Sequence, residues 1–333
     1  MTRRIVFVTG GAGFIGSNIV AKLSEDPTLD VVVCDWLLEA DLGKWRNIAK
    51  HPIGDFVAPE MMFDWLEKRW RDVELVIHMG AVSSTTDPDA DKVLHANFTL
   101  SRDLFRWCAD RQRRLIYASS AATYGDGALG FDDKDDVASL QALRPLNTYG
   151  WSKALFDVFA ARQASRDYAP PQWVGLKFFN VYGPNEEHKH AMKSVASQIW
   201  PKVREGHTVQ LFKSYRDGVA DGGQERDFVY VRDVADVVSW LHKSEHVNGV
   251  FNLGSGKART FEDMAKAVFA AAGKPARIEY TPMPPAIRDK YQYFTEARME
   301  RLVAAGYNQP FTALEDGIDE YVKSYLAAPD PYR

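Results

Sequence analysis

The chain has 333 residues, of which 46% are hydrophobic and 26% are charged, and its formal net charge is −4 at pH 7. This composition is typical of a globular protein, and the length allows two lobes or one large α/β domain with an appended cap. The weakly acidic balance excludes a global attraction to nucleic acid or to an anionic membrane, so any phosphate must be bound locally.

The two cysteines, Cys34 and Cys108, are too few for a disulfide framework or a metal cluster. Cys34 ends the apolar run VVVC, which favours a buried thiol. No stretch approaches the roughly 20 apolar residues that a membrane-spanning helix needs, and Thr9 interrupts the N-terminal run before a signal peptide could form. We therefore expect a cytoplasmic protein with no metal site.

Short β-branched runs alternate with helical segments from residue 4 to about residue 178. The runs are IVFVT, VVVCD, ELVIH, RRLIYAS and WVGLKFF, and FIGSNIVAKLSE is the first helical segment. Helices are predicted near 89–110 and 149–168, whereas the hydrophobic residues of 37–70 do not recur with one clear period. The alternation predicts right-handed βαβ crossovers and an α/β protein with a doubly wound parallel sheet, the Rossmann architecture.

Beyond residue 178 the composition changes to turns rich in Pro and Gly, with the polar stretch KSYRDGVADGGQ at 213–224. Helices are predicted around 260–272 and 312–327, and the run 227–241 reads as a strand followed by a helix. We expect a cofactor-binding domain at 1–178 and a smaller C-terminal α/β substrate domain at 179–333. Residues 227–252 are expected to return to the first domain.

Gly10, Gly13 and Gly16 form a GxxGxxG pattern between the first strand and the first helix. Such glycines allow a tight turn, close approach of the backbone to a pyrophosphate, and close packing of the helix on the strand. The helix N-terminus then points N–H groups and its positive dipole end at the phosphates. Asp35 ends the second strand about 20 residues on, where a carboxylate accepts from ribose hydroxyls.

The residues leave the choice between NAD and NADP open. Asp35 favours a free 2′-hydroxyl, whereas Lys44 and Arg46 follow in a segment that could reach a 2′-phosphate. Lone cations of this kind are more often plain solvated charge.

Tyr149 and Lys153 are four residues apart on a predicted helix and therefore share one face. An ammonium so placed favours a phenolate, which needs its pKa lowered by roughly 3 units to act as a base near neutral pH. Ser120 follows the strand RLIYAS, where it could donate a hydrogen bond to the same substrate oxygen. A Tyr and a Lys at this spacing are usually just a helix face, but the phosphate loop and the SSAATYG motif favour catalysis.

With GxxGxxG, SSAATYG and YxxxK in this order, the chain resembles the extended short-chain dehydrogenase/reductase family, and within it the nucleotide-sugar epimerases and dehydratases. The resemblance runs nearly end to end. It implies a tightly bound nicotinamide cofactor that takes a hydride from a sugar carbinol and returns it to the same molecule.

Further motifs narrow the resemblance to one branch. In the 4,6-dehydratases of the family an acidic pair follows the active-site Ser or Thr, and Ala121 and Ala122 stand there in this chain. The stretches SSTT, SSAATYG, FNVYGP followed by HK, RDFVYV and YQYFT are together similar to the ADP-glycero-manno-heptose 6-epimerases. We therefore expect an isomerase rather than a dehydratase.

That resemblance implies oxidation of an ADP-linked heptose at C6 to a 6-keto intermediate and return of the hydride to the opposite face, with bound NADP and with NAD as the alternative. Tyr149 would serve one orientation of the ketone and Lys189 the other. From the residues alone, Lys189 is more readily interpreted as a clamp for phosphate or carboxylate. The product would supply heptose for the lipopolysaccharide core, and the protein would be a homo-oligomer, a pentamer by the family pattern.

The resemblance also carries over the binding residues one by one. Cofactor contacts are expected, besides the three glycines, Asp35, Tyr149, Lys153 and Lys189, at Phe14, Ile15, Trp36, Lys44, Met79, Gly80, Ala81, Ser83, Asn97 and Val181. Substrate contacts are expected at Ser83, Ser120, Asn180, Phe212, Lys213, Ser214, Tyr215, Arg226 and Tyr291. Arg226 is placed at the diphosphate because a guanidinium binds phosphate in a bidentate way.

The chain departs from the family pattern at three places. His190 and Ala191 stand where a Gly-Ser pair follows HK, and the loop 214–224 is longer. Pro59 stands where a second lysine for the 2′-phosphate is expected. These departures affect the substrate contacts and the choice between NADP and NAD.

Two alternatives remain. A 4-epimerase or keto-sugar reductase of the same fold would use Ser120, Tyr149 and Lys153 without needing Lys189. A cofactor-sensing binding module without chemistry would lose the Tyr or Lys of YxxxK, and both are present. A nucleic-acid-binding role is not supported, because the basic residues are dispersed and do not interleave with aromatic ones.

Overall fold

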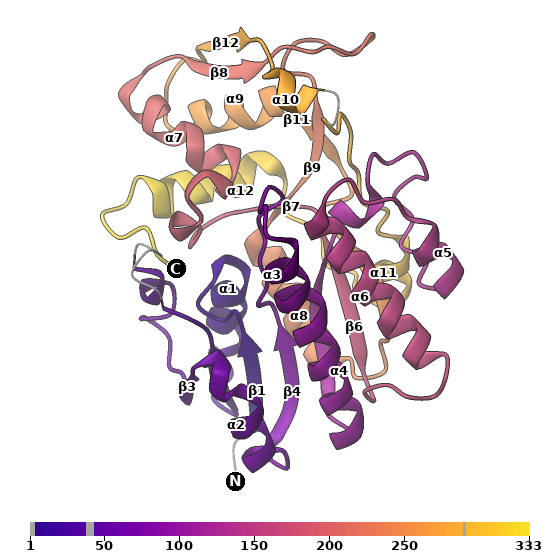
Figure 1. Cartoon of the computed structure of the whole chain (residues 1–333). Helices are drawn as coiled ribbons and strands as arrows, with labels where there is room; N and C mark the ends of the chain where they lie inside the picture. The colour runs from indigo at the N-terminus through magenta and orange to yellow at the C-terminus, as the bar shows by residue number, and fades with distance from the viewer. Residues whose placement is uncertain (1–3, 38–42, 289–290) are drawn as a thin grey trace.

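A computed structural model describes residues 4–37, 43–288 and 291–333 (Figure 1). Its main feature is a seven-stranded parallel sheet with the strand order β10-β6-β5-β4-β1-β2-β3. This arrangement confirms the predicted doubly wound α/β fold. The strands are β1 (Arg4–Thr9), β2 (Leu29–Cys34), β3 (Asp55–Val57), β4 (Val73–His78), β5 (Arg114–Ser120), β6 (Trp173–Phe178) and β10 (Gly249–Leu253).

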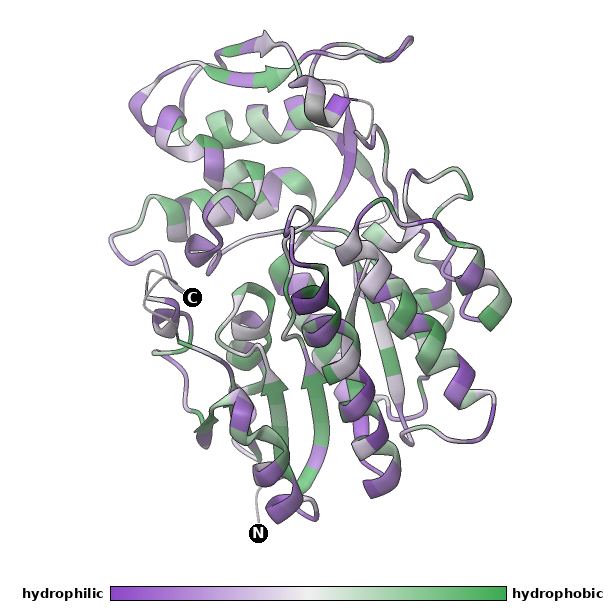
Figure 2. Cartoon of the chain, viewed as in Figure 1, coloured by the Kyte–Doolittle hydropathy of each residue, from purple (hydrophilic) through white to green (hydrophobic). Residues whose placement is uncertain are grey.

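Helices cover both faces of this sheet, and alternate strand residues point to each. Val6 and Val8 belong to one core with residues of α1 (Phe14–Leu23) and α8 (Val231–Lys243). Phe7 belongs to a second core with residues of α4 (Leu100–Arg111) and α6 (Thr148–Ala164). A strand buried on both faces needs apolar residues at successive positions, and Figure 2 shows β1 and β4 hydrophobic along most of their length.

The direction of the strand order reverses between β1 and β4. Strands β2 and β3 follow on one side of β1, whereas β4, β5 and β6 follow on the other. In open α/β sheets this switch point leaves a crevice beyond the carboxyl ends of the strands, where ligands bind. The glycine pattern and the end of β4 lie at this point.

A smaller layer of short strands and helices lies beyond those carboxyl ends, and the arrows of β1 and β4 point toward it in Figure 1. It contains one three-stranded sheet and one two-stranded sheet around a core that includes Trp200, Met264 and Phe269. The elements are β7 (Asn180–Tyr182), β8 (Val209–Phe212), β9 (Glu225–Tyr230), β11 (Ala258–Thr260), β12 (Ile278–Thr281), α7 (Val195–Glu205), α9 (Phe261–Ala271), α10 (Pro285–Arg288) and α12 (Leu314–Tyr321).

Within 227–252 the elements divide between the two layers: β9 pairs with β7 and β11, whereas β10 pairs with β6 in the main sheet. Helix α8 packs against α1. The division into domains at residue 178 stays a prediction.

The predicted helices differ from the observed ones mainly at their ends. The segment predicted as one helix over 89–110 comprises α3 (Ala90–Leu94), a π-helical turn η4 (His95–Thr99) and α4. Helix α6 ends at Ala164 rather than near residue 168, and Asp167 follows with a left-handed φ of 58°. Helix α12 passes into a second π-helical turn, η7 (Val322–Leu326).

The segment 37–70, which gave no clean period, has mixed structure. Residues 38–42 lie outside the described residues, and the rest forms η2 (Lys44–Asn47), β3, η3 (Pro59–Met61) and α2 (Met62–Arg69). The remaining short elements are η5 (Ala121–Tyr124), α5 (Val137–Ala142), η6 (Glu187–Met192) and α11 (Glu300–Ala304).

None of the helices in the described ranges is long and apolar enough to cross a membrane. Among the same residues, no group of three or more His, Cys, Asp or Glu side chains is placed to hold a metal ion. Cys34 and Cys108 are both buried, and burial raises the pKa of the Cys34 thiol to about 12.

Candidate active site

The turn between β1 and α1 approaches the end of β4 so closely that side chains do not fit. Gly10 has a φ of 63°, and a Cβ built on it would lie 2.6 Å from the Gly80 backbone nitrogen. Met79 N–H donates to the Thr9 carbonyl at 3.1 Å, which holds the two strand ends together. A Cβ on Gly16 would clash with the Gly10 carbonyl. Glycine is therefore sterically required by the turn itself at positions 10 and 16.

The N-terminus of α1 has the properties of an anion site. Gly13 is its N-cap and offers no side-chain cap, and the first turn carries no acidic residue. The free N–H groups and the positive end of the helix dipole are thus available to a diphosphate. This chemistry fits the pyrophosphate of a nicotinamide dinucleotide.

Asp35 lies just beyond β2, and its carboxylate already has three donors. One oxygen accepts from Ala12 N–H at 2.9 Å, and the other accepts from Trp36 N–H at 2.8 Å and from the Lys44 ammonium at 2.7 Å. The Trp36 indole, half exposed, donates to Glu60 at 2.7 Å. The structure thus joins Asp35 to Lys44, the two residues that favour different 2′ groups. Pro59 begins the short turn η3, next to Glu60.

Of the residues predicted after β4, Met79 and Gly80 contact the end of β1, whereas Ala81 and Ser83 are exposed. Asn97 is fully buried in the π-helical turn. Its amide pairs with both backbone groups of Val82, at 2.8 and 2.9 Å, and donates to the Ser152 hydroxyl at 3.0 Å. Asn97 therefore ties the segment after β4 to the helix that carries Tyr149.

A buried histidine that the sequence reasoning did not select continues this connection. His78 Nδ1 lies 2.6 Å from the Thr9 hydroxyl, and its Nε2 lies 2.9 Å from the Ser101 hydroxyl. Burial lowers the pKa of His78 to about 3, so the ring is neutral. Ser101 donates its own proton to the Asn97 carbonyl, so it accepts from Nε2–H and leaves Nδ1 to accept from Thr9.

Helix α6 presents Tyr149 beside Ser120. Asn147 caps the helix by accepting from Gly150 N–H at 2.8 Å, and a Cβ on Gly150 would lie 2.6 Å from the Ala122 carbonyl oxygen. This close approach joins the helix start to the turn after β5. Burial raises the pKa of Tyr149, while a hydrogen bond with Ser120 lowers it. The Ser120 hydroxyl accepts from Ala122 N–H at 3.1 Å, which leaves its proton to be donated to the Tyr149 oxygen.

Lys153 lies one helical turn after Tyr149, is 3% exposed, and donates to the Ala118 carbonyl at 2.8 Å. Burial lowers its pKa to about 8, and the charge of Asp157 opposes this effect. The structure thus brings Ser120, Tyr149 and Lys153 together at the end of β5.

Lys189 comes from the turn η6 and lies against the start of α1. Its Nζ is 4.9 Å from the centroid of the Phe14 ring. The preceding turn is fixed on α1, because Asn18 donates to the Pro184 carbonyl at 3.0 Å and Asn185 donates to the Ser17 hydroxyl at 3.0 Å. Burial lowers the pKa of Lys189, and the nearby carboxylate of Glu186 opposes this effect.

Glu186, which the sequence reasoning did not select, fixes the rest of this turn. It is 1% exposed, and it accepts from Ser194 N–H at 2.6 Å and from the Tyr321 hydroxyl of α12 at 2.8 Å. His190, one of the departures from the family pattern, has a φ of 49° and a ψ of −121°, a conformation that costs an L-residue and favours glycine. The backbone is therefore strained at the residue next to Lys189.

The smaller layer gathers the predicted nucleotide contacts of the substrate. The Arg226 guanidinium, 8% exposed, lies 5.3 Å from the centroid of the Tyr291 ring, and Phe212 meets Tyr291 edge to face at 6.4 Å. Arg288, which was not predicted, lies 3.7 Å over the Tyr215 ring. Cations and aromatic rings in this arrangement can bind the nucleobase and the phosphates of a nucleotide.

The other predicted substrate contacts lie on neighbouring segments. Lys213 is exposed, and Ser214 N–H donates to Asp221 at 2.8 Å within the longer loop. Asn180 is exposed and Val181 half-buried on β7, and Ile15 is half-buried in α1. The roles of all these site residues stay predictions.

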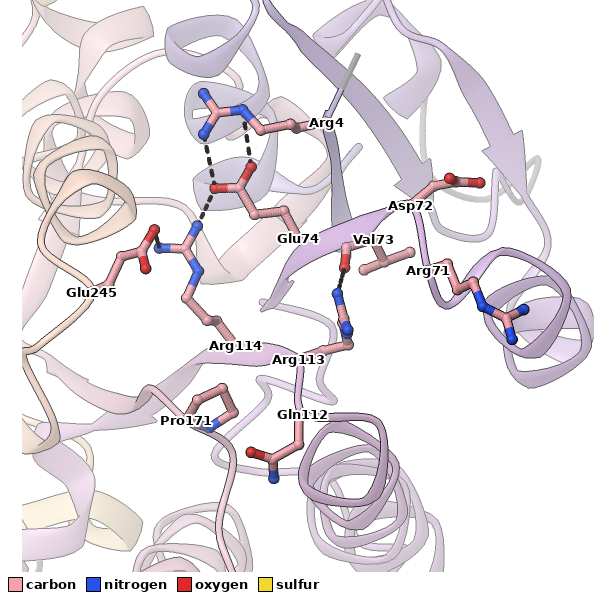
Figure 3. Close-up of a pocket in the computed structure, with 10 residues that line it drawn as sticks. All are labelled: Arg4, Arg71, Asp72, Val73, Glu74, Gln112, Arg113, Arg114, Pro171 and Glu245. Atoms are coloured by element: carbon pink, nitrogen blue, oxygen red, sulfur yellow. Dashed lines mark hydrogen bonds and ion pairs between the residues drawn. The ribbon is translucent and has the colours of Figure 1, made fainter. Parts of the chain in front are cut away.

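A pocket of about 480 Å³ at the opposite, N-terminal edge of the sheet has a different character (Figure 3). Arg4 and Arg114 both point at Glu74, and Arg114 also pairs with Glu245 at 3.4 Å. Its charges are thus largely compensated by ion pairs, and it lies at the end of β5 remote from Ser120.

Comparison with known proteins agrees with this geometry. The model of the NAD dependent epimerase/dehydratase family matches residues 6–254. The chain belongs to this family. Within the NAD dependent epimerase/dehydratase family, a relative from Nitratidesulfovibrio vulgaris is 48% identical over 98% of this chain and 99% of its own length, and one from Fusobacterium nucleatum is 43% identical over 98% and 100%. Both are named ADP-L-glycero-D-manno-heptose-6-epimerase.

Solved structures of the family share the fold. The Helicobacter pylori ADP-L-glycero-D-manno-heptose-6-epimerase superposes with a TM-score of 0.79 at 28% identity, covering 97% of this chain and 96% of that one. The Thermus thermophilus UDP-glucose 4-epimerase in complex with NAD gives 0.72 at 27% identity, covering 96% and 97%. The resemblance found from the motifs is confirmed, and together the comparisons support an epimerase with a nicotinamide cofactor.

Proposed function

We propose that the protein interconverts ADP-D-glycero-β-D-manno-heptose and ADP-L-glycero-β-D-manno-heptose by oxidation and reduction at C6. The observation that carries the proposal is that the Ser120, Tyr149 and Lys153 group is accompanied by a second, partly buried ammonium, that of Lys189, which lies against Phe14 at the start of α1. The near full-length relatives that bear the heptose epimerase name support it.

A nicotinamide dinucleotide held at Gly10, Gly13 and Gly16 and by Asp35 would supply the hydride chemistry at C6 that these side chains lack. Tyr149, as phenolate, takes the proton of the C6 hydroxyl, and the nearby Lys153 cation favours that phenolate. Once the substrate is bound, the Ser120 hydroxyl donates a hydrogen bond to the same substrate oxygen. The substrate becomes a 6-ketone.

Inversion requires that the ketone present its other face before reduction. We assign Lys189 as the acid and base for that second orientation, since it approaches the cofactor-binding helix from the η6 side. Its burial lowers the pKa of the ammonium, which helps it release a proton near neutral pH.

The ADP part of the substrate is assigned to the cluster of Phe212, Tyr215, Arg226 and Tyr291. A mostly buried guanidinium between two aromatic rings would bind a phosphate strongly, because the competing water is excluded. The exposed Tyr215 ring would stack on the adenine base of the ADP.

For the cofactor, we propose NADP, with NAD as the alternative. The Lys44 ammonium neutralises Asp35, the carboxylate that would otherwise repel a 2′-phosphate, and adds a positive charge there. We also propose a homo-oligomer, a pentamer by the family resemblance, in the cytoplasm, with a product that supplies heptose for the lipopolysaccharide core.

A 4-epimerase is the second candidate, because the Ser, Tyr and Lys group is shared with that reaction. A 4,6-dehydratase is disfavoured, since Ala121 and Ala122 provide neither acid nor base after Ser120. A 4-epimerase would have no need of Lys189, which distinguishes the two.

The test is to incubate the purified protein with ADP-D-glycero-D-manno-heptose, without added cofactor, and to follow the C6 configuration by proton NMR. Conversion to a mixture with the L-glycero epimer supports the substrate, the reaction and a tightly held cofactor together. No conversion, even with NAD or NADP added, would reject the heptose assignment and favour a different nucleotide sugar.

A further inference from the structure

Directly behind the candidate catalytic group lies an ion pair that is completely buried. Asp157 of α6 and Lys177 of β6 meet at 2.7 Å, and both side chains are 0% exposed. Burying two charges is costly unless further hydrogen bonds satisfy them, and a buried pair often contributes little to stability. Stability alone therefore does not explain why Asp157 and Lys177 are buried together.

Asp157 and Lys177 both satisfy their remaining hydrogen bonds at the end of β5. Asp157 accepts from the Ser119 hydroxyl at 2.7 Å and from the Tyr117 hydroxyl at 3.1 Å. Lys177 donates to the Thr123 hydroxyl at 2.7 Å. These bonds connect the pair to residues on both sides of Ser120.

Thr123 passes the connection on to Ser120 itself, because its hydroxyl donates to the Ser120 carbonyl at 2.8 Å. Lys153, from the same helix as Asp157, donates to the carbonyl of Ala118. Three successive residues, Ala118, Ser119 and Ser120, are thus each held by one side chain whose position depends on α6 or β6.

We propose that Asp157 and Lys177 are a positioning pair, which fixes the end of β5 so that Ser120 lies beside Tyr149 and which keeps a negative charge behind Lys153. The inference rests on the proposed role of Ser120, Tyr149 and Lys153. Neither member of the pair touches the substrate, because both are fully enclosed.

The position of Asp157 explains the second part of this role. Asp157 follows Lys153 by four residues on α6, so the two side chains occupy the same helix face. Its charge raises the pKa of Lys153 against the larger lowering caused by burial, with a net value of about 8. Without that charge, Lys153 loses its proton at a lower pH and no longer favours the phenolate of Tyr149.

The experiment replaces the pair as a unit, because changing one member alone leaves an uncompensated buried charge. The double variant Asp157→Leu/Lys177→Met is compared with the unchanged protein by thermal unfolding and by the pH profile of heptose epimerisation. We expect a folded protein, a loss in kcat on the order of 10²-fold from misplaced groups, and an alkaline limb moved to lower pH. KM should change much less than kcat, because the pair does not contact the substrate.

A second double variant separates charge from geometry and covers a failure of the first to fold. Asp157→Asn/Lys177→Gln keeps hydrogen-bonding groups and removes both charges. We expect it to retain more activity than the first variant but to show the same shift of the alkaline limb. A folded variant of either kind with unchanged kcat and an unchanged alkaline limb would overturn the proposal.

A matched control lies at the other end of the same strand. Arg114 begins β5 and pairs with Glu74 of β4 at the N-terminal edge (Figure 3). The variant Glu74→Leu/Arg114→Met also removes a strand-tethering ion pair, but far from Ser120. It should change the unfolding temperature without moving the pH profile.

A readout without substrate separates this proposal from the proposed function. The 13Cε resonance of Lys153 is titrated in lysine-labelled protein with its bound cofactor and assigned by its absence in Lys153→Met. A lower titration midpoint in Asp157→Asn/Lys177→Gln supports the positioning pair even if the heptose is not a substrate. An unchanged midpoint would contradict it even if the heptose is epimerised.

Discussion

The Lys189 ammonium lies 4.9 Å from the centre of the Phe14 ring, where the turn η6 meets the first residue of the cofactor-binding helix. This contact unites two segments 175 positions apart in the sequence. It places Lys189, the proposed second proton-transfer group, at the start of α1, whereas the proposed first one, Tyr149, lies beside Ser120 at the end of β5. The prediction for Lys189 follows from this contact.

Replacing Lys189 by Met should reduce heptose epimerisation by on the order of 10²-fold or more, because one orientation of the ketone loses its acid and base. The measurement is turnover by proton NMR or a coupled assay. Lys193→Met is the control, since Lys193 belongs to the same segment but pairs with Glu187 at 3.1 Å. Nearly full activity of Lys189→Met would favour a reaction of the 4-epimerase type.

The pH dependence of turnover should have an alkaline limb set by Lys153. Burial lowers the pKa of this lysine to about 8, so below that pH it is cationic and favours the Tyr149 phenolate. Above about pH 8 the cation is lost, and kcat/KM should fall as the pH rises. An alkaline limb that begins only near the ordinary pKa of lysine would contradict this assignment. The profile is measured with saturating cofactor.

Gly10→Ala should destabilise the protein by about 1 to 3 kcal/mol and lower its content of bound cofactor. Gly10 has a φ of 63°, and the new Cβ would lie 2.6 Å from the backbone nitrogen of Gly80. Gly273→Ala is the matched control, because its φ is 65° and no atom lies within 4 Å of the added Cβ. If both variants unfold alike and retain cofactor, the close approach of Gly80 has no role in binding.

Lys44→Met should shift the bound cofactor from NADP toward NAD, since it leaves the Asp35 carboxylate without its 2.7 Å cation. We expect the affinity for NADP to fall by on the order of 10-fold or more, which corresponds to a lost charge-assisted contact. The cofactor is extracted and identified by mass spectrometry, and both affinities are measured on the stripped protein. Lys50→Met is the control, because Lys50 is a nearby cation that pairs with Asp330 at 2.8 Å. NAD in the unchanged protein would reject the NADP proposal.

Local patterns predicted much of the fold. The five apolar runs correspond to β1, β2, β4, β5 and β6, and the glycine pattern marks a turn in which Gly10 requires a positive φ. Such features depend on neighbouring residues, which is why the sequence reveals them. The helix ends were predicted less accurately, since α6 ends at Ala164 and the segments predicted as helices over 89–110 and 312–327 each include a π-helical turn.

The surroundings of the site could not be predicted in the same way. Asp157 is visible in the sequence as the residue four positions after Lys153, but its partner Lys177 is on another element. Likewise, the hydrogen bonds of His78 with Thr9 and Ser101 join residues from distant segments. The same holds for the hydrogen bond between Glu186 and Tyr321. A hydrogen bond between distant segments has no local signature, because it depends on how the strands and helices are stacked.

The sequence by itself determined the strand and helix alternation, the phosphate turn, and the YxxxK pair whose spacing places Tyr149 and Lys153 on one helix face, because these follow from backbone geometry within a few residues. Only the tertiary structure decided that Lys189 lies against Phe14, that Lys44 neutralises Asp35, and that a buried ion pair holds the end of β5. These relationships arise when the parallel sheet brings the ends of distant strands together, which sets the burial and charge around each group and therefore its pKa.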